Sequence, residues 1–296
     1  MSVCPLCHSE ETADVGMYPG SFLSSERLIR CEGCDLVYAH PLPTEIELDS
    51  YYSSGNYFER VSNPFSESFY RFSVNLSRTR LRLLRSLTSL QDHCSVLDVG
   101  AGNAAFAAAL KEFSEKTSYD AVEPDPNIRA QYDGLVRNCY PSLTQIDRFD
   151  YDLAVLNQVL EHVPAPRDFL GGILKFVKKG GFVFIDVPHC DYSYKPDVAP
   201  HILFWKKNAI ATLFSQLEIE TIFAETAGMP AAKASQFFED SSFIGRISDP
   251  WAYLEFANTT LQMVGVKRRV NTFGRFQADV YGGNRQWLRA IGRKPL

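Results

Sequence analysis

Four cysteines near the N-terminus have the spacing of metal ligands. Two Cys-x-x-Cys pairs, separated by 23 residues, are formed by Cys4 with Cys7 and Cys31 with Cys34. Each pair can present two thiolates from one tight turn, and two such turns supply the four soft ligands that tetrahedral zinc prefers. Four occupied ligand positions are typical of a structural zinc site. The alternative is a redox dithiol or chance pairing, and the neighbouring His8 is interpreted as a bystander.

A glycine-rich turn follows an apolar run in VLDVGAGNAAFAAAL, which spans residues 96–110. Its composition is that of a buried strand, a tight turn and a helix. Glu123 ends a second predicted strand, 21 residues after Gly102. This span brings a carboxylate to the ribose hydroxyls of a nucleotide cofactor. Dinucleotide-binding oxidoreductases and S-adenosylmethionine (SAM) methyltransferases share the arrangement, so these residues alone leave both classes open.

The order of motifs further along the chain separates the two classes. VLDVGAG, AVEPD, YDLAVLNQVLEHV and KKGGFVFIDVP follow one another over roughly residues 93–190. In this the chain closely resembles the class I SAM-dependent methyltransferases. The cysteine pairs, followed by DLVYAHPLP and an aromatic-rich segment, resemble a subgroup that carries a zinc module ahead of the methyltransferase domain. Some members of that subgroup methylate sugar nucleotides.

The resemblance implies an α/β, Rossmann-like fold, with a seven-stranded, mostly parallel sheet between helices and SAM across the carboxyl ends of the first strands. Carried over by motif, the cofactor contacts are Asp98, Gly100, Ala101, Gly102, Glu123, Asn157 and Gln158. Asp98 would orient the methionine ammonium and Glu123 would bind the ribose hydroxyls. The turn's backbone would pass beneath the cofactor, and the two amides would border its methyl end. The family's loop often has another glycine near Ala104, where the extra methyl could narrow the pocket but should not abolish cofactor binding.

Two histidines are candidate catalytic residues on the acceptor side. His189 follows the predicted strand FVFIDVP, at the edge where open α/β sheets place ligands. Its imidazole could accept a proton from a hydroxyl, or from a carbon made acidic by a ketone, unless it is only a hydrogen-bonded loop residue. His201 resembles a histidine that the subgroup often shows before its next helix, where it could contact the acceptor. His162 is interpreted as structural, and Asp186 and Asp191 as surface aspartates that could orient either catalytic ring.

The subgroup's sugar C-methyltransferases are similar in carrying a histidine near this strand end. A Glu-His pair expected beside it is absent here, which leaves methylation of carbon and of oxygen both open.

An amphipathic helix is predicted over residues 65–90. Apolar residues recur there at three- and four-residue steps, with arginines between them at positions 71, 78, 80, 82 and 85. A solvated basic face is the favoured interpretation. The alternative is that one or two of these arginines bind a substrate phosphate. A short helix is expected at 45–52, and its aromatic residues Tyr51 and Tyr52, with Tyr57 and Phe58, either line a substrate pocket or seal the cysteine module onto the next domain.

Segments after the core motifs complete the predicted organisation. Alternation over 217–223 predicts a sixth strand, and 286–293 is expected to be the final strand. Aromatic residues over 231–266 predict helices that form a lid, a substrate wall, a dimer contact or plain core packing. The expected segments are a zinc-ribbon module at 1–42, a helical linker or substrate cap at 43–92, a SAM-binding Rossmann-like core at 93–230, and a helical insertion with the final strand at 231–296.

The amino-acid composition limits which classes of binding partner are expected. The formal net charge is −5 and the isoelectric point is near 5.7, which disfavours a nucleic-acid substrate. The N-terminus lacks the pattern of a signal peptide, and no run approaches the ~18 apolar residues of a membrane span. A cytoplasmic protein with reduced cysteines is therefore expected, with an oligomeric state that the sequence leaves open.

The leading hypothesis is a SAM-dependent methyltransferase that acts on a small-molecule acceptor, such as a nucleotide-linked sugar or a glycan precursor, at carbon or oxygen. One alternative is a methyltransferase of RNA or protein that recognises its substrate with the zinc ribbon. Another is a non-catalytic SAM-binding subunit, whose sign would be a cleft closed by side chains.

Overall fold

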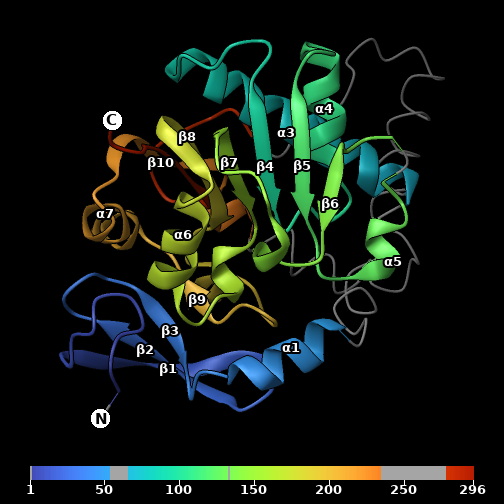
Figure 1. Ribbon diagram of the computed structural model, residues 1–296. Coiled ribbons are helices and arrows are strands. Elements are labelled where there is room, and N and C mark those ends of the chain that lie inside the picture. The colour runs from blue at the N-terminus through green and yellow to red at the C-terminus, as the bar shows by residue number, and fades with distance from the viewer. Residues whose placement is uncertain (1, 54–65, 133, 235–277) are drawn as a thin grey trace, which may run out of the picture.

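The protein is described here by a computed structural model, which places residues 2–53, 66–132, 134–234 and 278–296 (Figure 1). A central sheet carries helices on both faces, and a smaller antiparallel sheet lies beside it. The described part of the chain has no helix that is long and apolar enough to cross a membrane.

The central sheet has seven strands, most of them parallel. Its order is β10 (Glu220–Pro230), β11 (Arg285–Arg293), β8 (Val177–Pro188), β7 (Tyr151–Asn157), β4 (Ser95–Val99), β5 (Ser118–Val122) and β6 (Asn138–Tyr140). The pairs from β8 to β6 are parallel, whereas β11 runs antiparallel to both β8 and β10. The predicted seven-stranded, mostly parallel sheet is thus confirmed.

Successive side chains along each strand point to opposite faces of the central sheet, so the hydrophobic core has a part on each face. Val96 and Leu153 pack with α3 (Glu67–Leu87) and α4 (Ala105–Phe113). Their chain neighbours Leu97 and Ala154 point the other way, toward α6 (Pro166–Leu174) and α7 (Lys207–Gln216). Both faces are covered, which explains why these strands are apolar throughout.

The N-terminal sheet is antiparallel, and its fourth strand comes from a later part of the chain. Its order is β1 (Thr12–Phe22), β2 (Ser25–Cys31), β3 (Val37–His40) and β9 (Leu203–Phe204). The Ala39 N–H also donates to the Ile202 carbonyl at 2.8 Å. Since β9 lies between β8 and α7 in the sequence, the segment after β8 joins the two sheets, and their buried residues form one continuous core.

Short elements complete the described chain: α1 (Glu45–Ser53), α5 (Pro126–Arg129), and the 3-10 turns η1 (Leu143–Gln145), η2 (Leu160–His162) and η3 (Asp191–Ser193). The start of α1 is a capping box, in which the Thr44 N–H donates to Glu47 and the Glu47 N–H donates to the Thr44 hydroxyl. This cap fixes where α1 begins.

Most predicted elements have counterparts. The predicted helices at 45–52 and 65–90 correspond to α1 and α3, and the final strand corresponds to β11. The strand predicted at 217–223 begins later and extends to Pro230, because α7 ends in a turn at Glu218, whose φ is +56°. Tyr57, Phe58 and most of the helical stretch predicted at 231–266 lie outside the described residues.

Candidate cofactor and acceptor site

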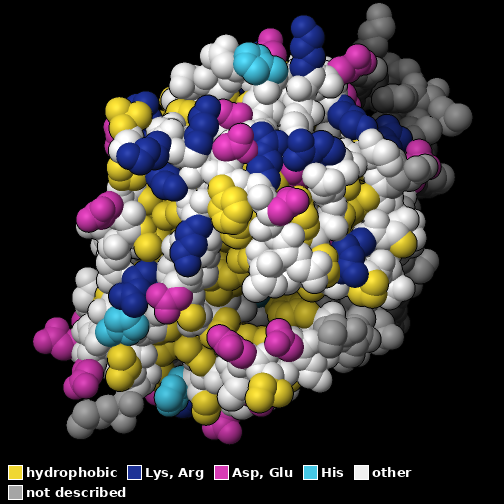
Figure 2. Space-filling model, viewed as in Figure 1, with side chains coloured by type: hydrophobic (Ala, Val, Ile, Leu, Met, Phe, Trp, Pro, Cys, Tyr) yellow, Lys and Arg dark blue, Asp and Glu magenta, His cyan; other side chains and the backbone are white. Residues whose placement is uncertain are grey.

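A cavity of about 1050 Å³ opens where β4, β5 and β7 end. The surface in Figure 2 is hollowed above α1, with hydrophobic side chains at the opening and acidic ones on the α1 side. Open α/β sheets bind ligands at the carboxyl ends of their strands. The cavity lining includes every cofactor contact predicted from the sequence: Asp98, Gly100, Ala101, Gly102, Glu123, Asn157 and Gln158.

The turn after β4 forms the cavity floor and depends on left-handed backbone. Gly100 has φ of +73°, and a Cβ there would lie 2.7 Å from Cγ2 of Val159. Gly102 has φ of +53° with open space around it. Ala104, the departure noted in the sequence, also has a positive φ, of +53°, at the start of α4. Its methyl is fully buried against the core and does not line the cavity, so it does not narrow the pocket as expected.

Asp98 places a buried carboxylate at the end of β4. The Tyr119 hydroxyl donates to Oδ2, while Oδ1 has no hydrogen-bond partner among the described residues. Burial raises the pKa of Asp98 to about 7, although the hydrogen bond from Tyr119 acts in the opposite direction. A cationic group entering the cavity would therefore find an acceptor that needs a positive partner.

Glu123 is held at the end of β5 by backbone donors. The Gly102 N–H donates to one carboxylate oxygen at 3.0 Å and the Asp125 N–H donates to the other at 3.0 Å. Burial raises the pKa of this carboxyl, and the two N–H groups oppose that rise. The side chain is thus fixed against the turn, with lone pairs left for a diol.

The two amides after β7 differ in how they are held. Asn157 Oδ1 is buried and has no partner within the described chain. Gln158 has φ of +57°, and both its backbone N–H and its Nε2 donate to the Asp186 carbonyl, at 2.7 and 3.0 Å. Left-handed backbone at a residue other than glycine is stored strain, which is common at functional sites.

Arg80 departs from the solvated face expected for its helix. It is 6% exposed, lines the cavity and donates from Nε to Asp186 at 2.7 Å. Arg289, which is fully buried on β11, donates to the same carboxylate oxygen at 2.9 Å. Asp186 is therefore no surface aspartate and bonds neither candidate histidine. By contrast, Arg78 forms an exposed ion pair with Glu112, as a surface arginine should.

The two histidines predicted as catalytic do not line the cavity formed by the described residues. His189 accepts or donates at Nδ1 to the Arg285 carbonyl at 3.0 Å, and burial lowers its pKa. His201 is bonded through Nδ1 to Asp191 at 2.8 Å, so Asp191 orients one of the two rings. His162 does line the cavity, with its ring centroid 5.0 Å from that of His201. The catalytic roles of His189 and His201 stay predictions.

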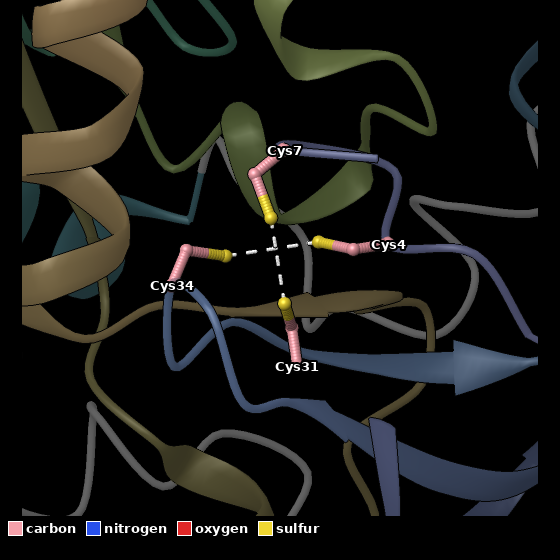
Figure 3. A group of neighbouring side chains, drawn as sticks. All are labelled: Cys4, Cys7, Cys31 and Cys34. Carbon is pink, nitrogen blue, oxygen red and sulfur yellow. Dashed lines mark hydrogen bonds between the residues drawn. The ribbon is translucent and has the colours of Figure 1, made fainter. Parts of the chain in front are cut away.

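The four N-terminal cysteines converge, as Figure 3 shows. Their sulfur atoms all lie within 4.8 Å of one another, with Cys4 and Cys34 at 3.7 Å and Cys7 and Cys31 at 3.4 Å. Cys4 and Cys7 come from the turn before β1, whereas Cys31 ends β2 and Cys34 lies in the turn that follows it. Such a set can hold a metal ion.

Comparison with known proteins gives the same class as the fold and the cavity. Residues 70–229 match the family described as the methyltransferase domain. A ubiquinone biosynthesis O-methyltransferase of Hydrogenovibrio crunogenus is 23% identical over 151 residues, which are 47% of this chain. The match spans only 61% of that relative's length.

Solved structures share the fold at low sequence identity. A Burkholderia thailandensis 1,6-didemethyltoxoflavin-N1-methyltransferase, with bound 1,6-didemethyltoxoflavin and S-adenosylhomocysteine, has a TM-score of 0.51 and 15% identity, over 94% of this chain and all of that one. A Haemonchus contortus phosphoethanolamine N-methyltransferase in complex with SAM has a TM-score of 0.51 and 11% identity, over 88% of this chain and 62% of that one.

The fold and the cavity at its strand ends define the class of Rossmann-like methyltransferases. Within that class, the chain belongs to the methyltransferase-domain family, which matches more than half of its length, and it is an enzyme of the transferase type.

Proposed function

We propose that this protein transfers a methyl group from SAM to an oxygen of a small molecule with an apolar ring. The observation that carries the proposal is that one cavity combines Asp98, Glu123 and the glycine turn with space beyond them. When bound, SAM supplies an electrophilic methyl group on a sulfonium. The name of the curated relative, an O-methyltransferase, supports oxygen as the acceptor atom.

The residues of the turn have distinct roles in this proposal. Asp98 binds the methionine ammonium and Glu123 accepts hydrogen bonds from the ribose hydroxyls. The short backbone of the turn lets the cofactor approach β4. Asn157, whose Oδ1 lacks a partner within the described chain, faces the methionine and methyl end.

The acceptor class is inferred from the rest of the cavity lining. A cofactor of SAM's size fills roughly half of a cavity at the upper end of the usual range, so an acceptor has room. The walls outside the turn are largely apolar, with Leu48, Phe72 and Trp287 among them, and Glu45 and Asp49 stand on the α1 side. Arg80, already paired with Asp186, is the one Lys or Arg among the described lining residues. This balance favours an uncharged or cationic acceptor over a nucleotide diphosphate.

We further propose that the four cysteines hold a structural zinc ion. Four sulfur ligands fill a tetrahedral site and leave no position for a substrate. Cys4, Cys31 and Cys34 are at most 2% exposed, which also favours a structural ion.

Calorimetric titration of the purified protein with S-adenosylhomocysteine, with NAD in parallel, tests the proposal. Micromolar binding of the homocysteine compound, roughly 8 kcal/mol, with none for NAD is the expected result. Glu123→Gln should weaken that binding at least about tenfold, because the ribose loses a charged acceptor. The control is Glu112→Gln, which changes an exposed carboxylate on α4. Binding of NAD in place of the homocysteine compound, or unchanged binding by Glu123→Gln, would refute the proposed site.

A further inference from the structure

A second group of metal-ligating side chains lies beside the cavity, far from the cysteines in sequence. Glu161 and His162 belong to η2, and His201 precedes β9. One potential ligand atom from each residue lies within 4.8 Å of the other two, and His162 Nε2 is 3.9 Å from Glu161 Oε1. Around a metal with bonds near 2.1 Å, ligand atoms stand roughly 3.3 Å apart, so the ligands need to close by about 1 Å.

Both imidazoles are oriented by acceptors behind them. His162 Nδ1 lies 3.3 Å from the Pro200 carbonyl, and His201 Nδ1 lies 2.8 Å from Asp191 Oδ2. A proton on each Nδ1 satisfies these acceptors and leaves Nε2 of each ring with its lone pair. Histidine ligands in metal sites are held in this way, often by a carboxylate. Asp191 is fixed in turn by Lys195, whose Nζ donates to it at 2.8 Å.

Glu161 supplies the independent observation. It is 1% exposed, and neither of its carboxylate oxygens has a hydrogen-bond partner among the described residues. Burying such a group without a partner is costly. Its backbone is not free to relax, because the Ile202 N–H donates to the Glu161 carbonyl at 2.8 Å and ties η2 to the segment that carries His201. A cation held by the carboxylate and the two imidazoles would satisfy the buried Glu161 oxygens.

We infer that Glu161, His162 and His201 form a second metal site, which takes a divalent first-row transition-metal ion. Two imidazoles and one carboxylate suit zinc, manganese, iron or cobalt. Three protein ligands leave a coordination position open, as in catalytic sites. His162 lines the cavity, so this position faces the space assigned to the acceptor.

The role of the ion rests on the proposed function. A hydroxyl bound to a divalent cation ionises more readily and releases its proton to solvent. Its oxygen then forms the new bond to the methyl carbon while the carbon–sulfur bond breaks and its electron pair returns to sulfur. The described cavity lining carries one imidazole, that of His162, and the carboxylates of Glu45, Asp49, Asp98, Glu123, Asp125 and Asp168. A metal-bound hydroxyl would allow oxygen methylation without any of these groups acting as the general base.

The test is a count of cobalt ions per chain, on protein without a polyhistidine tag, after loading with Co²⁺ under reducing conditions and removal of excess metal. The wild type should hold two ions, one with the thiolate-to-cobalt charge-transfer band of the cysteine site and one with weak visible bands only. Glu161→Gln and His201→Gln should each hold one ion and keep the thiolate band. His93→Gln, which removes an exposed histidine elsewhere, should hold two.

A wild type that holds a single ion, with all of its absorbance in the thiolate band, would overturn the inference even if no variant folds. A second ion that persists in both Glu161→Gln and His201→Gln would overturn it as well. The count requires no SAM and no turnover. Two ions without methyl transfer would therefore contradict the proposed function and leave the metal site standing.

Discussion

The role proposed for Asp98 depends on its ionisation. Burial raises its pKa to about 7, so below that pH the carboxyl of the ligand-free protein is protonated. A bound ammonium group requires the carboxylate. Affinity for S-adenosylhomocysteine should therefore rise by about tenfold per pH unit up to pH 7 and level off above it.

Calorimetry between pH 5.5 and 8 measures this slope, with Asp98→Asn as the comparison. The variant should bind weakly at every pH and lose the slope, and a slope retained in Asp98→Asn would assign the titration to another group. The same shift acts on stability with the opposite sign. Because the folded pKa is raised from 3.8, the stability it contributes is present below about pH 4 and is lost as the pH rises through 7.

Two glycines of one turn should respond differently to an added methyl group. At Gly100 the new Cβ would meet Val159 at 2.7 Å and the backbone is left-handed, so Gly100→Ala should lower the free energy of unfolding by roughly 2–3 kcal/mol. Gly102→Ala meets no atom within 4 Å and should cost about 1 kcal/mol. The open space around Gly102 belongs to the cavity, so this variant should instead lose affinity for S-adenosylhomocysteine.

Denaturant unfolding and calorimetry of the two variants separate these effects. Equal losses of stability would show that the contact with Val159 does not constrain the turn.

At the scale of elements, β8 is linked to α3 and β11 through one buried carboxylate. Asp186 compensates the charges of Arg80 and Arg289, and it is fully buried. Asp186→Asn leaves two buried guanidinium groups without an anion between them, so it should destabilise the protein by about 3–5 kcal/mol. Glu112→Gln, which breaks the exposed pair with Arg78, should cost at most about 1 kcal/mol. Comparable losses in denaturant unfolding would mean that the buried triad adds nothing.

The triad of Arg80, Asp186 and Arg289 separates what the sequence predicts from what it does not. The central strands, α3 and the glycine turn were predictable because each rests on local periodicity or on a turn that requires glycine. The run of arginines favours a solvated face for Arg80, although it lies four residues from both Leu76 and Leu84, which are buried. Its phase in the helix was the available signal. Its partner, 106 residues away on β8, left no local trace.

In the candidate site, too, the residues within local motifs were predictable and their distant partners were not. The predicted cofactor contacts all line one cavity, because their motifs lie at the ends of neighbouring strands. The sequence indicates a structural role for His162, yet this residue of η2 lines the cavity. His162 is bonded to Pro200 in the segment before β9, and His201 is bonded to Asp191 in η3. No local sequence pattern indicates that these segments meet.

At the scale of the whole molecule, the cysteine site supports more than its own sheet. Its turns and strands share one hydrophobic core with the α6 and α7 face of the central sheet. If the proposed zinc ion is bound there, Cys34→Ser should lose one zinc ion per chain and lower the unfolding midpoint of the entire protein in a single transition, since a structural zinc ion contributes directly to folding. Cys94→Ser alters a buried cysteine outside the site and should keep the zinc content.

Metal analysis and differential scanning calorimetry follow both quantities. A separate low-temperature transition in Cys34→Ser, with the main transition unmoved, would contradict this coupling.

The pairing of β3 with β9 limits how the N-terminal segment can be exchanged between proteins by recombination. Residues 37–38 are joined to residues 203–204, so the N-terminal module and the core each hold half of one ladder. A recombination event that moved the first 42 residues onto another methyltransferase would leave an open strand edge on both products, and open edges promote aggregation. The two parts should therefore descend together, and exchange between lineages should succeed only when the segment before α7 is carried along.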